Sequence, residues 1–170
     1  RTACPTNLGT GMRASAMLHL PGLVLSDQVN KVIQAVNKIG LAVRGLYGEG
    51  TEALGNLFQV SNQHTLGEPE NEIIARLEKV IKQIIEHEEN AREKLYDDNR
   101  TTLDDKIGRS YAILRYGHII STKEALDLLS MLRLGVDLGY FSDELRGLID
   151  VLFMEIQPAH LQVYANRKLN

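Results

Sequence analysis

The strongest constraint on the fold is one apolar stripe in the middle of the chain. Between residues 70 and 95, apolar side chains recur at intervals of three and four, with glutamate, lysine and arginine between them. This spacing predicts a long amphipathic helix, running to about Leu95, that buries one face against another layer. The stripe consists of Ile73, Ile74, Leu77, Val80, Ile81, Ile84 and Ile85.

The sequence before this helix predicts short strands and one further helix. Apolar spacing over residues 29–39 indicates a helix that begins near Ser26 and Asp27, two candidate N-caps, and ends at Gly40. Short apolar runs bounded by turn residues predict the strands. The predicted strands are residues 14–20, 41–44 and 56–60.

The sequence after residue 98 predicts helices only. A polar break at residues 97–100 separates the two parts, and Ser121 and Ser142 are candidate N-caps in the second part. We therefore expect an α+β part at residues 1–98 and an all-helical part at residues 99–170. The helices of the second part are predicted at residues 102–116, 121–134 and 142–155, with a short one after Pro158.

Composition excludes several classes of function. The 170 residues are 44% apolar and 24% charged, with a net charge of −3, so no general basic field favours nucleic acid. No apolar run approaches the roughly 20 residues of a membrane span. The single cysteine, Cys4, forms no internal disulfide and is typical of the reducing cytoplasm. We expect a cytoplasmic protein with neither membrane nor direct nucleic-acid contacts.

The opening segment combines a thiol, a glycine-rich turn and a cation. Cys4 is followed by Gly9, Gly11 and Arg13. Backbone N–H groups and a guanidinium favour a thiolate and can also hold an anion such as a phosphate. The alternative roles are a small buried cysteine and a solvated arginine at the start of a strand.

A second glycine-rich segment follows the second predicted strand. Arg44 leads it, and Glu49 lies between two of its three glycines. A carboxylate can pair with a planar guanidinium through two parallel hydrogen bonds, which makes Glu49 a candidate substrate ligand. Such a glycine pattern is weak evidence alone, and Glu49 could instead be a solvated loop residue.

The remaining charged and histidine residues indicate no further chemistry. His19 and His64 have no second ligand at metal-binding spacing and are interpreted as ordinary polar residues. Residues 86–89, Glu-His-Glu-Glu, are expected on the solvated face of the long helix. No metal site is predicted.

Three segments resemble the ATP:guanidino phosphotransferases, or phosphagen kinases. Residues 4–10, Cys-Pro-Thr-Asn-Leu-Gly-Thr, match the cysteine signature of that family at every position, and residues 44–49 and 58–62 resemble two further motifs. The resemblance implies an antiparallel sheet of the glutamine synthetase type, with ATP bound and Mg²⁺ held through the nucleotide. Met17 replaces a histidine of the animal enzymes, Gln59 an aspartate near the nucleotide, and Thr65 an arginine.

The resemblance also assigns roles to individual residues. Cys4 and Glu49 would orient and polarise the guanidinium, and Arg13 and Arg44 would contact the phosphates. The full set of residues implied to bind ATP is Arg13, Ala14, Ser15, Ala16, Met17, Arg44, Gly45, Leu46, Tyr47, Gly48 and Glu49.

The helical part following these motifs resembles the bacterial protein arginine kinases of the Clp protease stress system. That resemblance implies phosphorylation of arginine side chains in proteins, an activator protein, the Clp protease machinery and a homodimer. Residues 1–98 would be the C-terminal portion of the catalytic domain, and residues 99–170 an incomplete domain for dimerisation and phosphoarginine binding. Further catalytic arginines and acids would lie upstream, so this piece alone is expected to be inactive.

Two other functions remain open at this point. A kinase for free arginine or another small guanidino compound would carry the same motifs around Cys4 and Glu49. A non-catalytic binding module would use the helical part to hold partners. The helical part favours a protein substrate, because a free amino acid needs no added docking surface.

Overall fold

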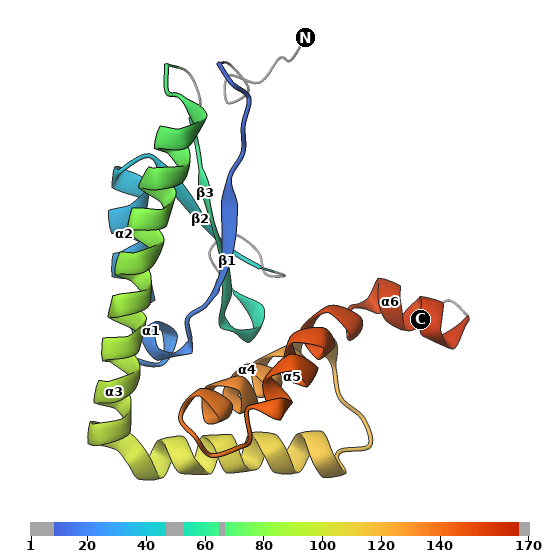
Figure 1. The fold of residues 1–170 in the computed structure, drawn as a ribbon. Helices are drawn as coiled ribbons and strands as arrows, with labels where there is room; N and C mark the ends of the chain where they lie inside the picture. Colours follow the sequence, from blue (N-terminus) through green and yellow to red (C-terminus); the bar gives the residue numbers. More distant parts are fainter. Residues whose placement is uncertain (1–8, 47–52, 65–66, 167–170) are drawn as a thin grey trace. The chain divides into compact units, whose positions relative to one another are not determined.

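The computed structural model describes residues 9–46, 53–64 and 67–166 (Figure 1). The chain divides into two units, Arg1–Asp98 and Asn99–Asn170. The N-terminal unit contains a small sheet with helices, and the C-terminal unit contains helices alone among its described residues. The predicted α+β class is confirmed.

A three-stranded antiparallel sheet organises the N-terminal unit. Its strands are β1 (Ser15–His19), β2 (Leu41–Gly45) and β3 (Leu57–Asn62), and β3 lies in the centre. All three overlap the strands that the sequence predicts. Residues directly opposite one another in adjacent strands point to the same face of a sheet. Gln59 is opposite both Met17 on β1 and Arg44 on β2, so these three side chains share one face.

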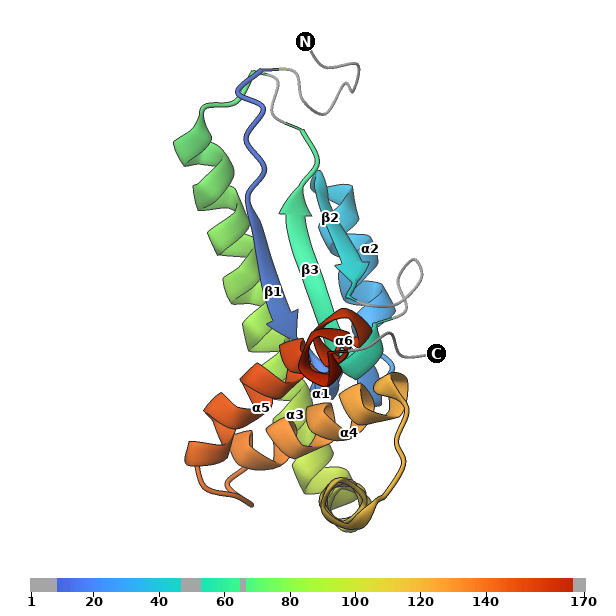
Figure 2. The same cartoon turned by 90° about the vertical axis from the view of Figure 1, so that its right-hand side faces the viewer.

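Helices cover the other face of the sheet. In Figure 2, α2 (Val29–Lys38) and the first part of α3 (Glu70–Tyr116) both lie behind the strands, and the short helix α1 (Pro21–Leu25) follows β1. A single 3-10 turn, η2 (Leu54–Asn56), precedes β3. Among the described residues of this unit, no element covers the face that carries Arg44. The sheet therefore has one face packed on helices and one without a described helix, which we call the open face; Met17 and Arg44 are exposed on it, whereas Leu57 and Ser61 of the central strand are buried.

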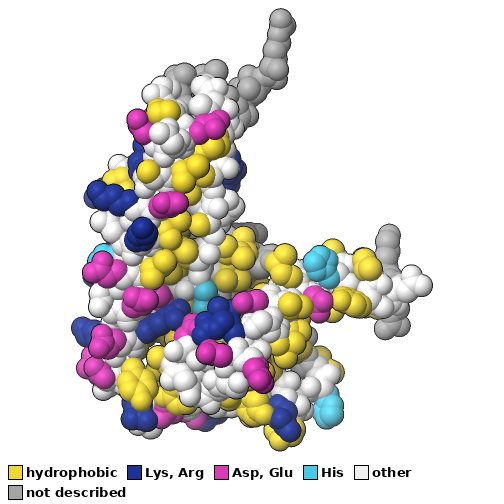
Figure 3. All heavy atoms as spheres, viewed as in Figure 1, with side chains coloured by type: hydrophobic (Ala, Val, Ile, Leu, Met, Phe, Trp, Pro, Cys, Tyr) yellow, Lys and Arg dark blue, Asp and Glu magenta, His cyan; other side chains and the backbone are white. Residues whose placement is uncertain are grey.

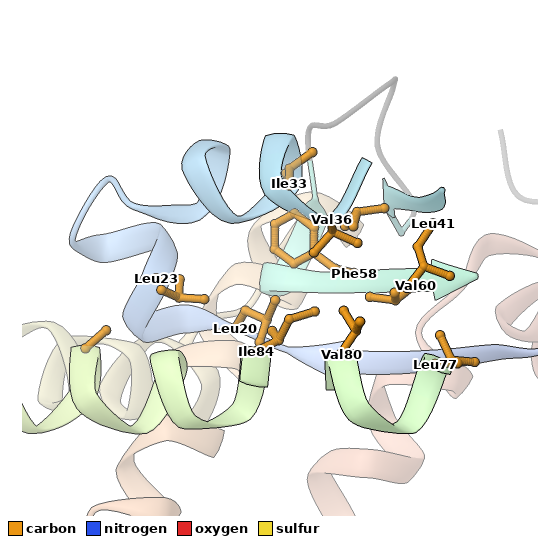
Figure 4. Packing of buried hydrophobic residues seen from close by; sticks show 12 residues of the cluster. Leu20, Leu23, Ile33, Val36, Leu41, Phe58, Val60, Leu77, Val80 and Ile84 are labelled. Atoms are coloured by element: carbon orange, nitrogen blue, oxygen red, sulfur yellow. The ribbon is translucent and has the colours of Figure 1, made fainter. Parts of the chain in front are cut away.

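The core of the N-terminal unit lies between the covered face and the helices (Figure 4). Phe58 and Val60 of β3 are 2% and 0% exposed and meet the apolar sides of α2 and α3. Most of the predicted stripe of α3 supplies this contact, as its amphipathic spacing requires. Two of its members, Ile74 and Ile85, are instead 44% and 41% exposed, because they lie at the edge of the apolar face. The main members of the core are Leu20, Leu23, Ile33, Val36, Leu41, Val43, Phe58, Val60, Leu77, Val80 and Ile84.

The start of α2 differs from the prediction. Ser26 and Asp27 are not N-caps of this helix, which begins at Val29. Ser26 instead ends α1, and its hydroxyl donates a hydrogen bond to the carbonyl of Gly22 at 2.8 Å. Asp27 takes a left-handed backbone, with φ of 57°. The sequence analysis missed α1, because five residues are too few to show a helical period.

The polar break predicted at residues 97–100 is confirmed as a kink in α3, at which two helical stretches meet. α3 has helical assignment through these residues, and only Asn99 leaves the helical region, with φ of −137° and ψ of 34°. Polar residues thus mark both the kink and the boundary between the two units. Over the face shown in Figure 3, acidic and basic side chains are mixed along α3.

The structure overturns the expectation for one member of the charged run at residues 86–89. Glu88 is only 4% exposed, whereas we expected a solvated side chain. Its carboxylate accepts hydrogen bonds from the backbone N–H groups of Gly22 and Leu23 at 2.7 and 2.8 Å. Arg92 Nε donates a third bond at 2.6 Å. Glu88 therefore joins α3 to the first turn of α1.

The C-terminal unit contains the end of α3, then α4 (Thr122–Asp137), α5 (Glu144–Glu155) and α6 (Pro158–Ala165). Ser121 is confirmed as the N-cap of α4, since its hydroxyl accepts from the Glu124 N–H. The N-cap of α5 is Asp143 and not Ser142, although the Ser142 hydroxyl still accepts from the Glu144 N–H. None of the described helices has the length and apolar character that crossing a membrane requires.

Candidate functional site

A polar hollow of about 290 Å³ lies at one end of the sheet, and we call it the sheet pocket. Segments from before β1, from β2 and from the end of β3 converge on it. Arg13 and Arg44 both line it, although one precedes β1, the other lies on β2, and these two strands do not pair with each other. Its lining residues are Gly11, Met12, Arg13, Ala42, Arg44, Ser61, Asn62, Gln63 and His64.

Arg44 reaches this site through the alternation of β2. Leu41 and Val43 point into the core, so Ala42 and Arg44 point to the open face. Arg44 is exposed there, across from Gln59 of the central strand. The apolar residues of the strand thus fix the direction of the charged one.

Arg13 precedes β1 by two residues and is held by the end of β3. The Asn62 backbone N–H donates to the carbonyl of Ala14 at 3.3 Å, which extends the pairing beyond Ser15. The Asn62 side-chain oxygen accepts from the Ala14 N–H at 2.8 Å. The Asn62 amide nitrogen donates to the carbonyl of Met12 at 3.0 Å. The backbone is therefore tied on both sides of Arg13.

The other residues expected to contact ATP divide between the two faces of the sheet. Ser15 and Met17 lie on the open face, and Met17 is 56% exposed. Ala16 is opposite the buried Val60, so it faces the helices. Ala14, Gly45 and Leu46 do not line the sheet pocket. The structure brings together Arg13 and Arg44 from the predicted set.

Several predicted site residues lie outside the described residues, namely Cys4, Tyr47, Gly48 and Glu49. The described residues on either side of 47–52 are nevertheless joined to the sheet. Leu46 N–H donates to the carbonyl of Leu57 at 2.8 Å, and Leu54 N–H donates to the carbonyl of Leu46 at 3.2 Å. The chain thus leaves and rejoins the same end of β2, just after Arg44.

The electrostatics of the sheet pocket favour an anion. Among the described residues that line it, two are arginines and none is aspartate or glutamate. Neither Arg13 nor Arg44 forms a salt bridge with any described residue. Two guanidinium groups without a carboxylate partner can bind a phosphate through charge-assisted hydrogen bonds. No cluster of potential metal ligands occurs in the described part of the chain.

The sequence analysis did not name Asn62 and His64 as site residues, and both line the sheet pocket. Asn62 belongs to the segment Phe-Gln-Val-Ser-Asn, whose resemblance to a family motif was the available signal. His64 had no such signal, because one histidine without a partner at ligand spacing indicates nothing. Its proximity to the arginines follows from the turn after β3.

Two larger hollows contain no arginine. One, of about 400 Å³, lies between α2 and α3 and has an apolar floor that includes Val36, Val80 and Ile84. The other, of about 580 Å³, lies between α5 and α6 and is lined by Val151, Met154 and Val163 among others. The sheet pocket is therefore a candidate site because two arginines line it, and not because of its size.

Comparison with known proteins gives two family matches that divide the chain. Residues 2–91 match the model of the ATP:guanido phosphotransferase C-terminal catalytic domain. Residues 100–170 match the model of the protein-arginine kinase McsB C-terminal domain. The boundary between the matches falls beside the boundary between the two structural units.

Curated relatives match the chain over nearly all its length. The protein-arginine kinase of Bacillus cytotoxicus is 52% identical over 168 residues, which cover 99% of this chain and 47% of that protein. The protein-arginine kinase of Bacillus mycoides is 53% identical over 168 residues, covering 99% of this chain and 48% of that protein. The chain thus spans about half the length of the curated relatives it matches. Because the first family model accounts for more than half of its residues, the chain belongs to the ATP:guanido phosphotransferase family.

Proposed function

We propose that the full-length protein transfers the γ-phosphoryl group of ATP to the guanidinium of arginine side chains in proteins. The observation that carries this proposal is the convergence of Arg13 and Arg44 on one pocket without an acidic partner among the described residues. Membership of the family and the names of the curated relatives support the same reaction. ATP is then the phosphate-bearing ligand of the sheet pocket.

The reaction must overcome the weak nucleophilicity of the substrate. A guanidinium is delocalised and protonated near neutral pH, so its nitrogen attacks only if it is aligned and loses a proton. The transferred group spreads negative charge over its oxygens, which positive side chains must neutralise. Arg13 and Arg44 are suited to this neutralisation, since both guanidinium groups are exposed on the open side of the sheet.

Cys4 and Glu49 are proposed to act on the substrate. A carboxylate such as Glu49 can pair with two N–H groups of the arginine, which would both orient it and favour loss of its proton. A thiolate at Cys4 would add negative charge beside the same group. These roles come from the motifs that carry the two residues.

Mg²⁺ is proposed to arrive with the nucleotide. A magnesium ion prefers oxygen ligands, and nucleotide enzymes commonly hold it with few protein ligands and the substrate phosphates. The described lining of the sheet pocket offers arginines and no carboxylate, so it suits the phosphates rather than the metal. The ion would supply further positive charge at the transferred group.

A protein substrate is favoured over free arginine by the C-terminal unit. Its residues match a domain named for protein-arginine kinases, and a free amino acid needs no such docking unit. We propose that this unit also forms a homodimer and binds phosphoarginine. Apolar side chains on α5 and α6 support a contact surface, since Val151, Met154 and Val163 are 50%, 51% and 79% exposed.

The cellular setting is proposed from the same relationship. We infer that the protein acts in the cytoplasm in a stress response, marks proteins for the Clp protease machinery and responds to an activator protein. The single cysteine is compatible with a reducing compartment.

The test of the reaction uses the full-length protein with Mg²⁺ and ATP, offered either a protein substrate or free arginine. We expect acid-labile phosphate on arginine side chains of the protein, located by mass spectrometry under mild conditions. Phosphate on free arginine alone would replace this proposal with a small-molecule kinase. No transfer to either substrate, with partner binding retained, would favour the binding module.

Glu49→Gln in the full-length protein tests the role of the loop carboxylate. The change removes charge while keeping shape, so we expect phosphoryl transfer to fall by about 10²-fold or more with ATP affinity nearly unchanged. Single-turnover rates and nucleotide titration measure the two quantities separately. An unchanged rate would show that Glu49 is no substrate ligand.

A further inference from the structure

The side chain of Asn62 forms hydrogen bonds with the backbone of both neighbours of Arg13. It is 7% exposed and continues the buried positions Phe58 and Val60 along β3. Its oxygen accepts from the Ala14 N–H at 2.8 Å, and its nitrogen donates to the carbonyl oxygens of Met12 and His64 at 3.0 and 3.3 Å. One amide therefore binds three backbone groups, two of them from Met12 and His64, which line the sheet pocket, and one from Ala14, which follows Arg13.

These contacts leave Asn62 no free donor for a ligand. A side-chain amide has two N–H donors, and both are used on the carbonyl oxygens of Met12 and His64. An anion in the sheet pocket would need a donor, so Asn62 is poorly suited to contact it directly. Any effect of Asn62 on an anionic ligand must therefore pass through the backbone that it holds.

Arg13 depends on this backbone more than Arg44 does. Arg44 lies within β2, whose ladder with β3 fixes its direction on both sides. Arg13 lies before the first paired residue of β1, Ser15, where the regular ladder has ended. Beyond the one backbone bond between Asn62 and Ala14, the side-chain bonds from Asn62 to Met12 and Ala14 hold the backbone on both sides of Arg13.

We propose that Asn62 is a positioning residue for nucleotide binding, whose amide fixes the backbone around Arg13 and so holds that guanidinium beside Arg44 over a phosphate. The inference rests on the proposed function, because it assumes that the sheet pocket binds ATP. An amide is suited to this task, since it supplies donor and acceptor together without adding a charge. An aspartate at this position could not donate to Met12 and would bring a negative charge to the two arginines.

A double-mutant cycle in the full-length protein tests this coupling. The dissociation constant for ATP with Mg²⁺ is measured for wild type, Asn62→Ala, Arg13→Ala and the double variant. We expect Asn62→Ala to weaken ATP binding by about 10-fold when Arg13 is present, because a misplaced charged group loses much of its contact. With Arg13 already replaced, we expect Asn62→Ala to change the constant by less than about 2-fold.

Val36→Ala is the matched control. Val36 is a buried core residue of α2 outside the sheet pocket, so its truncation loosens the same unit without touching Arg13. We expect the control to lower the melting temperature and leave ATP affinity within about 2-fold of wild type. If Asn62→Ala does not fold, the neutral variant Asn62→Ser takes its place in both arms of the cycle.

The outcomes separate this inference from the proposed function. Equal effects of Asn62→Ala with and without Arg13 would overturn it, as would an equal loss of affinity in Val36→Ala. Unchanged affinity in Asn62→Ala, with a wild type that binds ATP and transfers phosphate, would overturn the positioning role alone. A wild type that binds no ATP would overturn the proposed function and this inference with it.

Discussion

Two buried polar side chains, the neutral Asn62 and the charged Glu88, hold the chain just before and just after β1. At the beginning, the neutral Asn62 binds the backbone around Arg13, beside the sheet pocket. At the end, the charged Glu88 binds the first N–H groups of α1, and Arg92 Nη2 donates to the carbonyl of His19 at 3.3 Å. The same strand is thus fixed once next to two arginines that have no acidic partner among the described residues, and once next to an arginine paired with Glu88.

The difference between these ends shows how charge is distributed in the N-terminal unit. The negative charge of Glu88 is matched by Arg92 and three hydrogen bonds, so its burial serves the fold. At the sheet pocket, the residue that holds the backbone is the uncharged Asn62, and neither arginine has an acidic partner among the described residues. We therefore expect changes near Asn62 to affect ligand binding and changes near Glu88 to affect stability.

The largest expected effect is on activity, from Arg44→Ala in the full-length protein. Loss of a guanidinium at the transferred phosphate should lower the phosphoryl-transfer rate by about 10³-fold or more. Because the side chain is exposed, the free energy of unfolding should change by less than about 0.5 kcal/mol. Single-turnover kinetics and denaturant titration provide the two measurements. A large loss of stability would contradict our expectation that residues at the sheet pocket affect ligand binding rather than folding.

The second prediction concerns Glu88→Ala. Removing one partner of a buried ion pair leaves the Arg92 Nε–H and two N–H groups of α1 without their carboxylate acceptor, which should cost about 3–5 kcal/mol of unfolding free energy. ATP affinity, measured at a temperature where the variant is folded, should stay within about 2-fold of wild type. Weakened ATP binding at unchanged stability would reverse the roles that we assign to the two ends.

A smaller effect is expected from Glu88→Gln, and it should depend on pH. The amide keeps the shape but turns a donor toward an N–H group, at a cost of roughly 1–3 kcal/mol. Burial raises the pKa of Glu88 above its ordinary value of 4.5, against the opposing effects of Arg92 and the two N–H groups. The folded protein then holds this proton more tightly than the unfolded chain does.

The direction of the pH effect follows from that raised pKa. The contribution of Glu88 is fully present below pH 4.5 and is lost as the pH rises through the raised pKa. The glutamine variant does not titrate here, so the stability difference from wild type should be larger at about pH 5 than at about pH 8. Urea titrations at the two pH values measure it. A difference that shrinks on acidification would show that the three donors outweigh burial.

The smallest effect is expected from Arg109→Ala, which tests whether burial sets the importance of Glu88. Asp105 and Arg109 form a 2.7 Å ion pair with the same spacing along α3 as Glu88 and Arg92. Their side chains are 57% and 74% exposed, and solvent screens such a pair. The melting temperature should not change measurably. A decrease in melting temperature comparable to that of Glu88→Ala would show that the spacing of an ion pair, and not its burial, sets its contribution to stability.

Much of the fold is predictable because local periodicity reports burial. The stripe of α3 and the three strands follow from apolar spacing, and Ser121 is the N-cap that its sequence indicates. Ser26 was misassigned because a hydroxyl can cap either the start or the end of a helix, and the neighbouring α1 was not recognised. A serine therefore identifies a helix start only where no neighbouring helix could end at the same residue.

Glu88 shows what the charge pattern concealed. The buried residues of α3 include Ile73, Leu77, Val80, Ile84 and Ala91, and position 88 continues their three- and four-residue spacing. The helical spacing therefore placed Glu88 on the buried side of α3, whereas its charge led us to expect a solvent-exposed side chain. The donors that make this burial possible come from residues 22, 23 and 92, and no local pattern links the first two to it.

The sequence alone predicted a phosphate-binding role for Arg13 and Arg44, for Arg13 from the glycine-rich turn before it and for both from the resemblance of their segments to family motifs. Their meeting at one pocket was decided by the sheet order, in which β3 lies between the two strands that carry or follow them. The role of Asn62 also required the tertiary structure, since an amide reveals its partners only when distant backbone groups reach it. The sequence determines which side chains are present, but the distances between side chains far apart in the sequence depend on which strands pair.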